Sequence, residues 1–220
     1  MEDLIVEEFI PDEAELLLDV EALLEDLWAS DVNRRMLAAR AFSEVQEERA
    51  IPALIHLLQD NCPLVRVSSA YALGRNPCPK IVDALIAALR TDWNGYVRKG
   101  LIWALGNCCD SRAFEPLVDS LATDIPAVRL WSASALGQLG DLRAVPYLCT
   151  ALLDDPLAVV RSNCAWALGQ LECIEAIPTL IKALKDEDLS VQQDVHEALE
   201  RLGYNELEGD GVDVFEIPGT

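Results

Sequence analysis

Hydrophobic residues recur along most of the chain at intervals of three or four positions. In the stretch AIPALIHLLQD, which begins at Ala50, apolar residues follow one another at helical spacing, and the alternation typical of β-strands is absent. This spacing puts the apolar side chains on one face of a helix. The pattern predicts an all-α protein built from short amphipathic helices.

One helical segment occurs several times along the chain. Copies that share the letters VRxxxxxALG begin at Val65, Val97, Val128 and Val160, and successive arginines are 31 or 32 residues apart. Two further copies are degenerate: VQQDVHEALERL begins at Val191, and an earlier one begins at Arg35. A fixed step of this length is typical of repeat proteins.

A second helical segment lies between these copies and begins with a proline in most of them, namely Pro52, Pro116, Pro146 and Pro178. Proline is tolerated in the first turn of a helix, where its missing N–H is not needed. Each repeat is therefore two antiparallel helices, which are too small to bury their own apolar face. The sequence predicts a right-handed α-solenoid of stacked antiparallel helix pairs.

The stretch Val128–Leu152 fits the pattern VRxxxAxALGxLGDxRAVPxLxxAL. This pattern resembles HEAT repeats of the phycobilisome-lyase subtype, over about Ser30 to Gly203. The resemblance implies that arginine-bearing helices line the concave face and proline-started helices the convex face. We expect an acidic segment with a capping helix over 1–29, the solenoid over 30–203, and an acidic tail over 204–220.

The repeat register also predicts what holds the solenoid together. The core face of the arginine-bearing helix takes Val65, Ser69, Ala70, Leu73 and their equivalents. The glycine at Gly74 and its equivalents is expected to let helices approach closely and to end or loosen the helix. An aspartate lies five or six residues before each arginine, so an Arg–Asp ladder is expected along the stack. The alternative is a row of arginines that binds anions.

The charge of the chain restricts its partners. The formal net charge is −21, and no lysine or arginine precedes Arg34. Such a surface repels nucleic acid and anionic membranes, so we expect a protein partner with basic patches. The acidic ends are either solubilising caps or docking arms for a basic protein.

The same sequence features predict a cytoplasmic protein. Met1-Glu2-Asp3 lacks the basic start of a signal peptide, and no apolar run is long enough to span a membrane. Seven cysteines in no framework-like arrangement indicate reduced thiols.

The positions two and five residues after each ladder arginine point into the concavity and carry aromatic residues that the core does not need. With the polar residues that follow them, they form the candidate partner-binding set: Tyr71, Arg75, Trp103, Asn107, Trp131, Gln138, Asn163, Trp166 and Gln170. Trp and Tyr dominate protein interfaces because they bury a large area at low entropic cost. The alternative is that these rings pack on one another. Trp93 and Tyr96 could extend the patch toward one edge.

The cysteines do not form a recognisable metal site within the chain. Cys149 and Cys164 fall at core positions, and Cys78, Cys109 and Cys173 fall in equivalent turns. Adjacent repeats lie about 8–10 Å apart, whereas sulfurs that share a zinc ion lie within about 4 Å. Cys108 and Cys109 are expected to be an exposed thiol pair, and they are candidate ligands for a site that another protein completes.

No motif for catalysis or phosphate binding occurs, and His56 and His196 have no nucleophile at a suggestive spacing. The sequence therefore favours a non-catalytic scaffold that binds no cofactor by itself. The stretch DWNGYVRKGLIWALGNCC resembles cyanobacterial HEAT-repeat proteins that associate with an IscA-type iron–sulfur carrier. This resemblance implies such a carrier as partner, with a cluster at the interface.

The phycobilisome-lyase subtype implies a different function, a bilin lyase subunit or a phycobiliprotein chaperone or degradation adaptor. Concave rings would suit a flat bilin, and Arg75 or Arg98 could meet its propionates. The strongly acidic surface argues against an anionic ligand.

Overall fold

Twelve α-helices follow one another in residues 19–204, the part of the chain that the computed structural model describes. They are α1 (Val20–Asp26), α2 (Val32–Ala41), α3 (Ile51–Leu57), α4 (Pro63–Arg75), α5 (Val82–Thr91), α6 (Gly95–Cys108), α7 (Phe114–Thr123), α8 (Pro126–Leu139), α9 (Val145–Asp154), α10 (Ala158–Gln170), α11 (Ile177–Ala183) and α12 (Leu189–Arg201). The predicted all-α fold is confirmed. The acidic residues before 19 and after 204 lie outside the described part.

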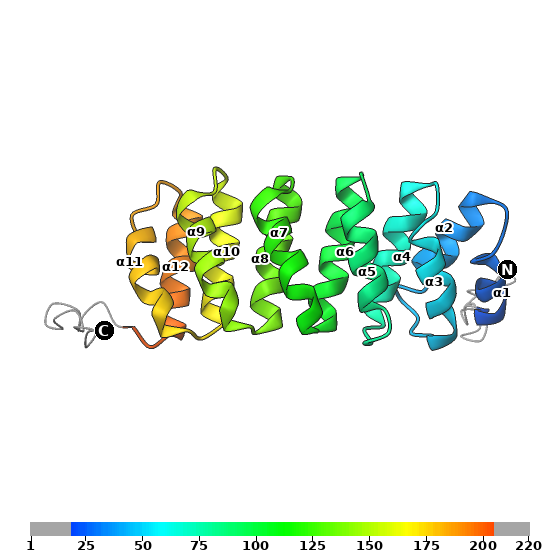
Figure 1. Ribbon diagram of the computed structural model, residues 1–220, viewed down its shortest axis with the longest axis horizontal. Coiled ribbons are helices and arrows are strands. Elements are labelled where there is room, and N and C mark those ends of the chain that lie inside the picture. The colour runs from blue at the N-terminus through cyan, green and yellow to red at the C-terminus, as the bar shows by residue number, and fades with distance from the viewer. Residues whose placement is uncertain (1–18, 205–220) are drawn as a thin grey trace, which may run out of the picture.

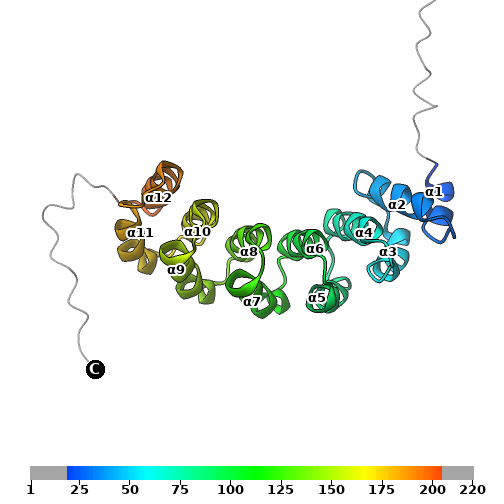
Figure 2. The same cartoon turned by 90° about the horizontal axis from the view of Figure 1, so that it is seen from above.

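The helices form antiparallel pairs that stack side by side in a single row (Figure 1). Figure 2 shows that the row bends into an arc, with helices α4, α6, α8, α10 and α12 on the inner side and helices α3, α5, α7, α9 and α11 on the outer side. The arginine-bearing helices therefore line the concave face, as the family resemblance implies.

Short 3₁₀ turns lead into the convex helices α3, α7, α9 and α11. In the turns before α7 and α9, the side chains of Asp110 and Asp141 accept the backbone N–H groups of Arg112 and Arg143. The same arginines return side-chain hydrogen bonds to these carboxylates. The letters DxRA of the repeat pattern thus encode a self-contained cap that sets the direction of the convex helix.

The predicted core positions are buried. Val65, Ser69, Ala70 and Leu73 have no exposed surface, and neither have Val160, Cys164, Ala165 and Leu168, three repeats further on. One cluster of buried side chains runs from Leu27 to Leu199. Each repeat therefore contributes to a continuous core that no single helix pair could form alone.

The glycines of the repeat have one of the two predicted roles. A Cβ atom on Gly137 would lie 2.9 Å from the Cα of Ala167 on the next concave helix. Close approach is therefore confirmed. Gly74 and its equivalents were also predicted to end or loosen their helices. They do not end them, because α4 and α8 continue one or two residues beyond the glycine. The left-handed conformation that terminates a helix occurs later, at Cys109 (φ 46°) and Gly140 (φ 72°).

Replacing Gly137 with alanine is expected to destabilise the protein by about 1–3 kcal/mol, because the added methyl group meets backbone that cannot move aside. Gly100→Ala is a matched control, since its Cβ would lie 3.4 Å from Val67, an ordinary contact. Alanine also favours a helix over glycine by about 0.5–1 kcal/mol. Urea unfolding of the two variants measures both effects, and equal destabilisation would rule out the packing role of Gly137.

An Arg–Asp ladder connects successive repeats along one edge of the solenoid. Each ladder arginine donates to the carboxylate that begins the next concave segment, in the pairs Arg35–Asp60, Arg66–Asp92, Arg98–Asp124, Arg129–Asp155 and Arg161–Asp186. The Nη1 atom of each arginine donates to a carbonyl in the turn before its own helix, as from Arg129 to Asp124 at 3.0 Å. The predicted ladder is confirmed.

The donors of the ladder arginines are engaged within the protein, so the ladder leaves no row of arginines for anions. In the last described repeat Gln192 takes the place of arginine, and its amide donates to the carbonyl oxygen of Asp186 at 2.6 Å. A neutral residue suits this position because the described part of the chain holds no further repeat with a carboxylate to pair with an arginine. Gln192 therefore marks the end of the ladder.

Candidate protein-binding face

The concave face carries a row of half-buried aromatic side chains, with Tyr71 on α4, Trp103 on α6, Trp131 on α8 and Trp166 on α10. The rings of Tyr71 and Trp103 lie 5.3 Å apart at an angle of 56°. For this pair, the alternative that the rings pack on one another is correct. Trp131 and Trp166 have a different setting.

Trp131 and Trp166 line an open hollow of about 370 Å³ on the concave face. Three neighbouring concave helices, α8, α10 and α12, provide its lining. The lining residues are Trp131, Ser134, Gln138, Asn163, Trp166 and Asp194. We call it the tryptophan hollow. The structure thus brings together four of the nine residues that the sequence predicts for partner binding, and it adds Ser134 and Asp194.

Polar contacts fix the walls of the tryptophan hollow. Ser134 lies 2.5 Å from the side-chain oxygen of Asn163, to which its hydroxyl donates. The hydroxyl of Ser162 donates to the carboxylate of Asp194. Each contact joins one concave helix to the next, so these side chains are held in place before any partner arrives.

Two concave tryptophans have a cation from the protein itself beside the ring. The guanidinium of Arg75 lies 5.9 Å from the ring centre of Trp103, and the ammonium of Lys99 lies 5.6 Å from that of Trp131. Both distances are within the range of cation–π attraction. The concave face therefore uses aromatic rings to hold basic side chains.

A second hollow of about 430 Å³ lies nearer the N-terminus on the concave face. Its lining is Met36, Arg40, Ser43, Leu64, Ser68 and Tyr71. Leu64 is 59% exposed, and the only charged group in this lining is the guanidinium of Arg40. The linings of the two hollows thus differ in the sign of their charge, with a cation on α2 and a carboxylate on α12.

The other four residues of the predicted set, Arg75, Trp103, Asn107 and Gln170, lie outside both hollows. Asn107 donates to the carbonyl of Gly74 at 3.0 Å, which ties α6 to α4 and gives it a structural role. Gln170 is half-buried at the end of α10. Trp103, between the two hollows, is covered by Tyr71 and Arg75.

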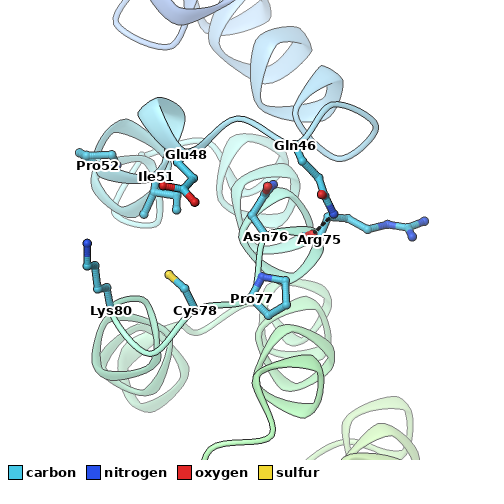
Figure 3. Close-up of a pocket in the computed structure, with 9 residues that line it drawn as sticks. All are labelled: Gln46, Glu48, Ile51, Pro52, Arg75, Asn76, Pro77, Cys78 and Lys80. Atoms are coloured by element: carbon cyan, nitrogen blue, oxygen red, sulfur yellow. Dashed lines mark hydrogen bonds between the residues drawn. The ribbon is translucent and has the colours of Figure 1, made fainter.

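Arg75 also borders a pocket of about 550 Å³ on the edge where the concave helices end (Figure 3). Its guanidinium extends away from Cys78 and Lys80, which line the opposite side of that pocket. Gln46 donates to the carbonyl oxygen of Arg75 at 3.1 Å and connects the loop after α2 to the end of α4 across this edge. The side chain of Arg75 therefore contributes to the concave face, and its backbone carbonyl accepts a hydrogen bond at the edge.

Trp93 and Tyr96 are the most exposed aromatic residues of the described part near the site, at 75% and 77%. They flank the start of α6, and Trp93 lies 5.7 Å from the guanidinium of the ladder residue Arg66. Trp93 therefore belongs to the ladder edge of the solenoid and lines no part of the tryptophan hollow.

The cysteine pair differs from its predicted form. Cys109 is exposed, but Cys108 is half-buried against the core, and burial raises the pKa of its thiol to about 11. The prediction of an exposed pair is wrong for Cys108, because the helix α6 extends to this residue and turns it inward. In residues 19–204 no group of three or more His, Cys, Asp or Glu side chains could hold a metal ion.

Cys109 is expected to react much faster than Cys108 with a thiol reagent at pH 8. With a pKa near 11, about one Cys108 thiol in a thousand is ionised at this pH, and only the thiolate is a good nucleophile. Stopped-flow labelling with a disulfide reagent should show a fast phase that Cys109→Ser removes and Cys108→Ser retains. Loss of that phase in Cys108→Ser alone would contradict the assignment.

Three features of the structure were not predicted from the sequence. Asp194 stands two residues after Gln192, at the position equivalent to Trp131, so the repeat register could have identified it. The hollow beside Arg40 depends on α2, whose sequence differs too much from the other copies to be aligned with them. Trp28 stacks on His56 at 5.2 Å on the first helix pairs, a contact for which the sequence has no signal.

These features place the chain among α-solenoids whose concave face carries a row of aromatic side chains. The family model for HEAT repeats matches residues 20–98, 82–169 and 150–208. The chain therefore belongs to the HEAT-repeat family. No curated protein matches the chain.

Several solved structures share this architecture. In the complex of CpcE and CpcF of phycocyanin lyase from Nostoc sp. PCC7120, the matching chain is 26% identical with a TM-score of 0.66, and the match covers 90% of this chain and 82% of that one. An engineered protein is 24% identical with a TM-score of 0.61, over 84% and 99% of the two chains. A designed armadillo repeat protein in complex with the peptide (KR)4 is 20% identical with a TM-score of 0.58, over 84% and 100%. The last two likenesses concern the fold alone.

None of the helices in residues 19–204 combines the length and the apolar character that crossing a bilayer requires.

Proposed function

We propose that this HEAT-repeat protein is a non-catalytic scaffold that holds a protein partner in its concave face. The observation that carries the proposal is the tryptophan hollow, which exposes parts of two indole rings among amide, hydroxyl and carboxylate groups. Partly buried Trp side chains in a concave setting are typical of interface hot spots. HEAT-repeat solenoids present such extended concave surfaces as binding faces.

The groups in the tryptophan hollow suit binding better than chemistry. The hydroxyl of Ser134 donates to Asn163, which is an amide and not a base. Asp194 is the one ionisable group among the six lining residues. A nucleophile with no base within reach has no means of activation.

The partner is expected to be basic where it meets this face. The net charge of −21 attracts basic surfaces at a distance and speeds their association. The acidic ends of the chain would act in the same direction as docking arms. This steering weakens as salt rises, because exposed charges are screened within about 10 Å at 0.1 M ionic strength.

Affinity capture from an extract of the source cells tests the scaffold. Immobilised wild type is compared with a double variant, Trp131→Leu with Trp166→Leu, and with Tyr147→Ala on the convex helix α9 as control. A partner of the concave face should be recovered by wild type and by the control and lost from the double variant. Equal recovery by all three would exclude the concave face as the binding surface.

A second candidate function is that of a lyase subunit or adaptor that acts on phycobiliproteins. The similarity to a chain of the CpcE–CpcF complex, at 26% identity over most of both chains, favours it. Under this proposal the concave rings hold a bilin or a bilin-bearing protein. Mixing the purified protein with bilin should then give a red-shifted absorption band, and an unchanged spectrum would eliminate direct bilin binding.

Partnership with an IscA-type iron–sulfur carrier is a narrower version of the scaffold proposal, and it rests on the sequence around Cys108 and Cys109. Of these two thiols only Cys109 is exposed, so a shared cluster would take Cys109 as its ligand from this chain. A coloured complex of the two proteins that survives gel filtration and is lost in Cys109→Ser would support this version. A colourless mixture would remove it and leave the scaffold proposal standing.

A further inference from the structure

We propose that the tryptophan hollow receives one basic side chain, an arginine or a lysine, from the partner protein. This inference rests on the proposed function and specifies what the partner presents. Four observations carry it: the composition of the hollow, the repeat register, the distribution of charge along the concave face, and the size of the hollow.

The lining of the hollow offers attraction to a cation on several sides. The indole of Trp166 provides a ring with no cation of the described residues beside it, whereas the ring of Trp131 already has Lys99 at 5.6 Å. Asp194 provides a carboxylate from α12. Ser134 and Asn163 add oxygen atoms that can accept hydrogen bonds. A guanidinium has five N–H donors and stacks on aromatic rings, so it can use all these groups together.

The repeat register shows that this kind of site is filled from within the protein elsewhere. Arg75, near the end of α4, lies beside Trp103 on the next concave helix. The residue of α8 that corresponds to Arg75 is Gln138, and the ring that corresponds to Trp103 is Trp166. A neutral amide thus stands where the earlier repeat supplies a cation.

Gln138 also points in the opposite direction from Arg75. Its side-chain oxygen lies 2.8 Å from the place of a Cβ on Gly106, so it folds back toward α6 and away from the ring of Trp166. Among the tryptophans of residues 19–204, Trp166 alone has neither a cation nor another ring within interaction distance. The site for a cation is therefore present beside Trp166 and is filled by no basic side chain of the described part.

Charge along the concave face points to the same occupant. The last concave helix, α12, carries Asp194 and Glu197 at the positions where the preceding helices carry rings, amides and small residues. No basic side chain lines the tryptophan hollow, whereas Arg40 lines the other concave hollow. An anion would be repelled at the α12 end, so a basic residue of the partner is directed to this end.

The volume of the hollow fits one side chain. At about 370 Å³ it is near the small end of ligand sites, which span about 300–1,000 Å³. It spans three consecutive helices of the stack, so the partner backbone can run along the solenoid while one side chain enters. The occupant is accordingly a residue of an extended basic segment.

The indole N–H signals of the five tryptophans in a ¹H–¹⁵N NMR spectrum provide a direct test on the full chain, with assignment by Trp→Phe variants. The probe is Nα-acetyl-arginine amide, and the matched neutral probe is Nα-acetyl-citrulline amide. Arginine should shift the signals of Trp131 and Trp166 in a saturable manner and leave those of Trp28 and Trp93 in place. Citrulline should bind at least about tenfold more weakly, because it lacks the cation.

Gln138→Arg is the decisive variant. The new arginine can lie beside Trp166 as Arg75 lies beside Trp103, so it should occupy the site from within and abolish the arginine-induced shifts. Gln170→Arg is the matched control, because it adds the same charge one repeat later, where Glu197 replaces the ring. It should leave the probe's affinity for the hollow within about twofold of wild type at 0.15 M salt.

Four results of these NMR titrations would overturn the proposal. Equal shifts with citrulline, shifts spread over all five indoles, an absence of shifts, or unchanged binding in Gln138→Arg would overturn the proposal. Failure of this proposal can be distinguished from failure of the scaffold proposal. If the captured partner still depends on Trp131 and Trp166 while the arginine probe does not bind, the concave face binds its partner through another group.

Discussion

Replacing Arg129 with alanine is expected to lower the free energy of unfolding by about 3–5 kcal/mol. The side chains of Arg129 and Asp155 are 14% and 6% exposed, and Nε of Arg129 lies 2.7 Å from the carboxylate. Its Nη2 lies 2.8 Å from the other carboxylate oxygen, so the pair is bidentate. Removing the arginine leaves the carboxylate of Asp155 buried without its partner, which costs more than the attraction itself.

Two variants separate this effect from the general loss of a charge. Arg143→Ala removes an arginine whose side chain is 62% exposed and pairs with Asp141, so it should change stability by at most about 1 kcal/mol. The double variant Arg129→Met with Asp155→Leu removes both charges and should recover much of the loss. Urea unfolding followed by circular dichroism measures all three. If Arg129→Ala lowers the free energy of unfolding no more than Arg143→Ala does, the ladder does not stabilise the stack.

The double variant Trp131→Leu with Trp166→Leu is expected to weaken binding of the purified partner by at least about a hundredfold. Loss of a central aromatic anchor costs about 2 kcal/mol or more at an interface, and two anchors of one hollow are removed together. Leucine keeps part of the apolar volume, so the half-buried positions remain filled. Isothermal titration calorimetry of the double variant and of each single variant gives the change in Kd.

Tyr147→Ala is the matched control for this loss. Tyr147 is 46% exposed on the convex helix α9, where its ring lies 6.3 Å from Phe114. Its replacement should leave Kd within about twofold, and the melting temperatures of all variants show whether they remain folded. A Kd that is unchanged in the tryptophan variants and raised by Tyr147→Ala would move the binding surface to the convex face.

Much of the fold follows from the sequence because the repeat gives the same information several times. The spacing of Val65, Arg66 and Leu73 recurs in the next three copies, so helix type, core face and ladder could be predicted together. The role of Gly74 was only half predictable. Its need for close approach depends on Ala104 of the next helix, whereas the end of a helix depends on local backbone further along the chain.

The candidate site was less predictable than the fold. The register correctly places Trp131, Asn163 and Trp166 on one face, since these positions follow from the ladder arginines. It does not indicate which rings stay open, because that depends on long side chains such as Arg75, which reach across to the next helix. Cys108 is a similar case, since its burial depends on where α6 ends and not on the pattern of cysteines.

Site-specific photo-cross-linking tests the central claim, that a partner occupies the concave face at the tryptophan hollow. A benzoylphenylalanine at position 166 is compared with one at position 147 on the convex face, each in the full chain with the purified partner. The account predicts an efficient cross-link from position 166, within a basic segment of the partner, and little or none from position 147. Cross-links from position 147 without any from position 166 would contradict it.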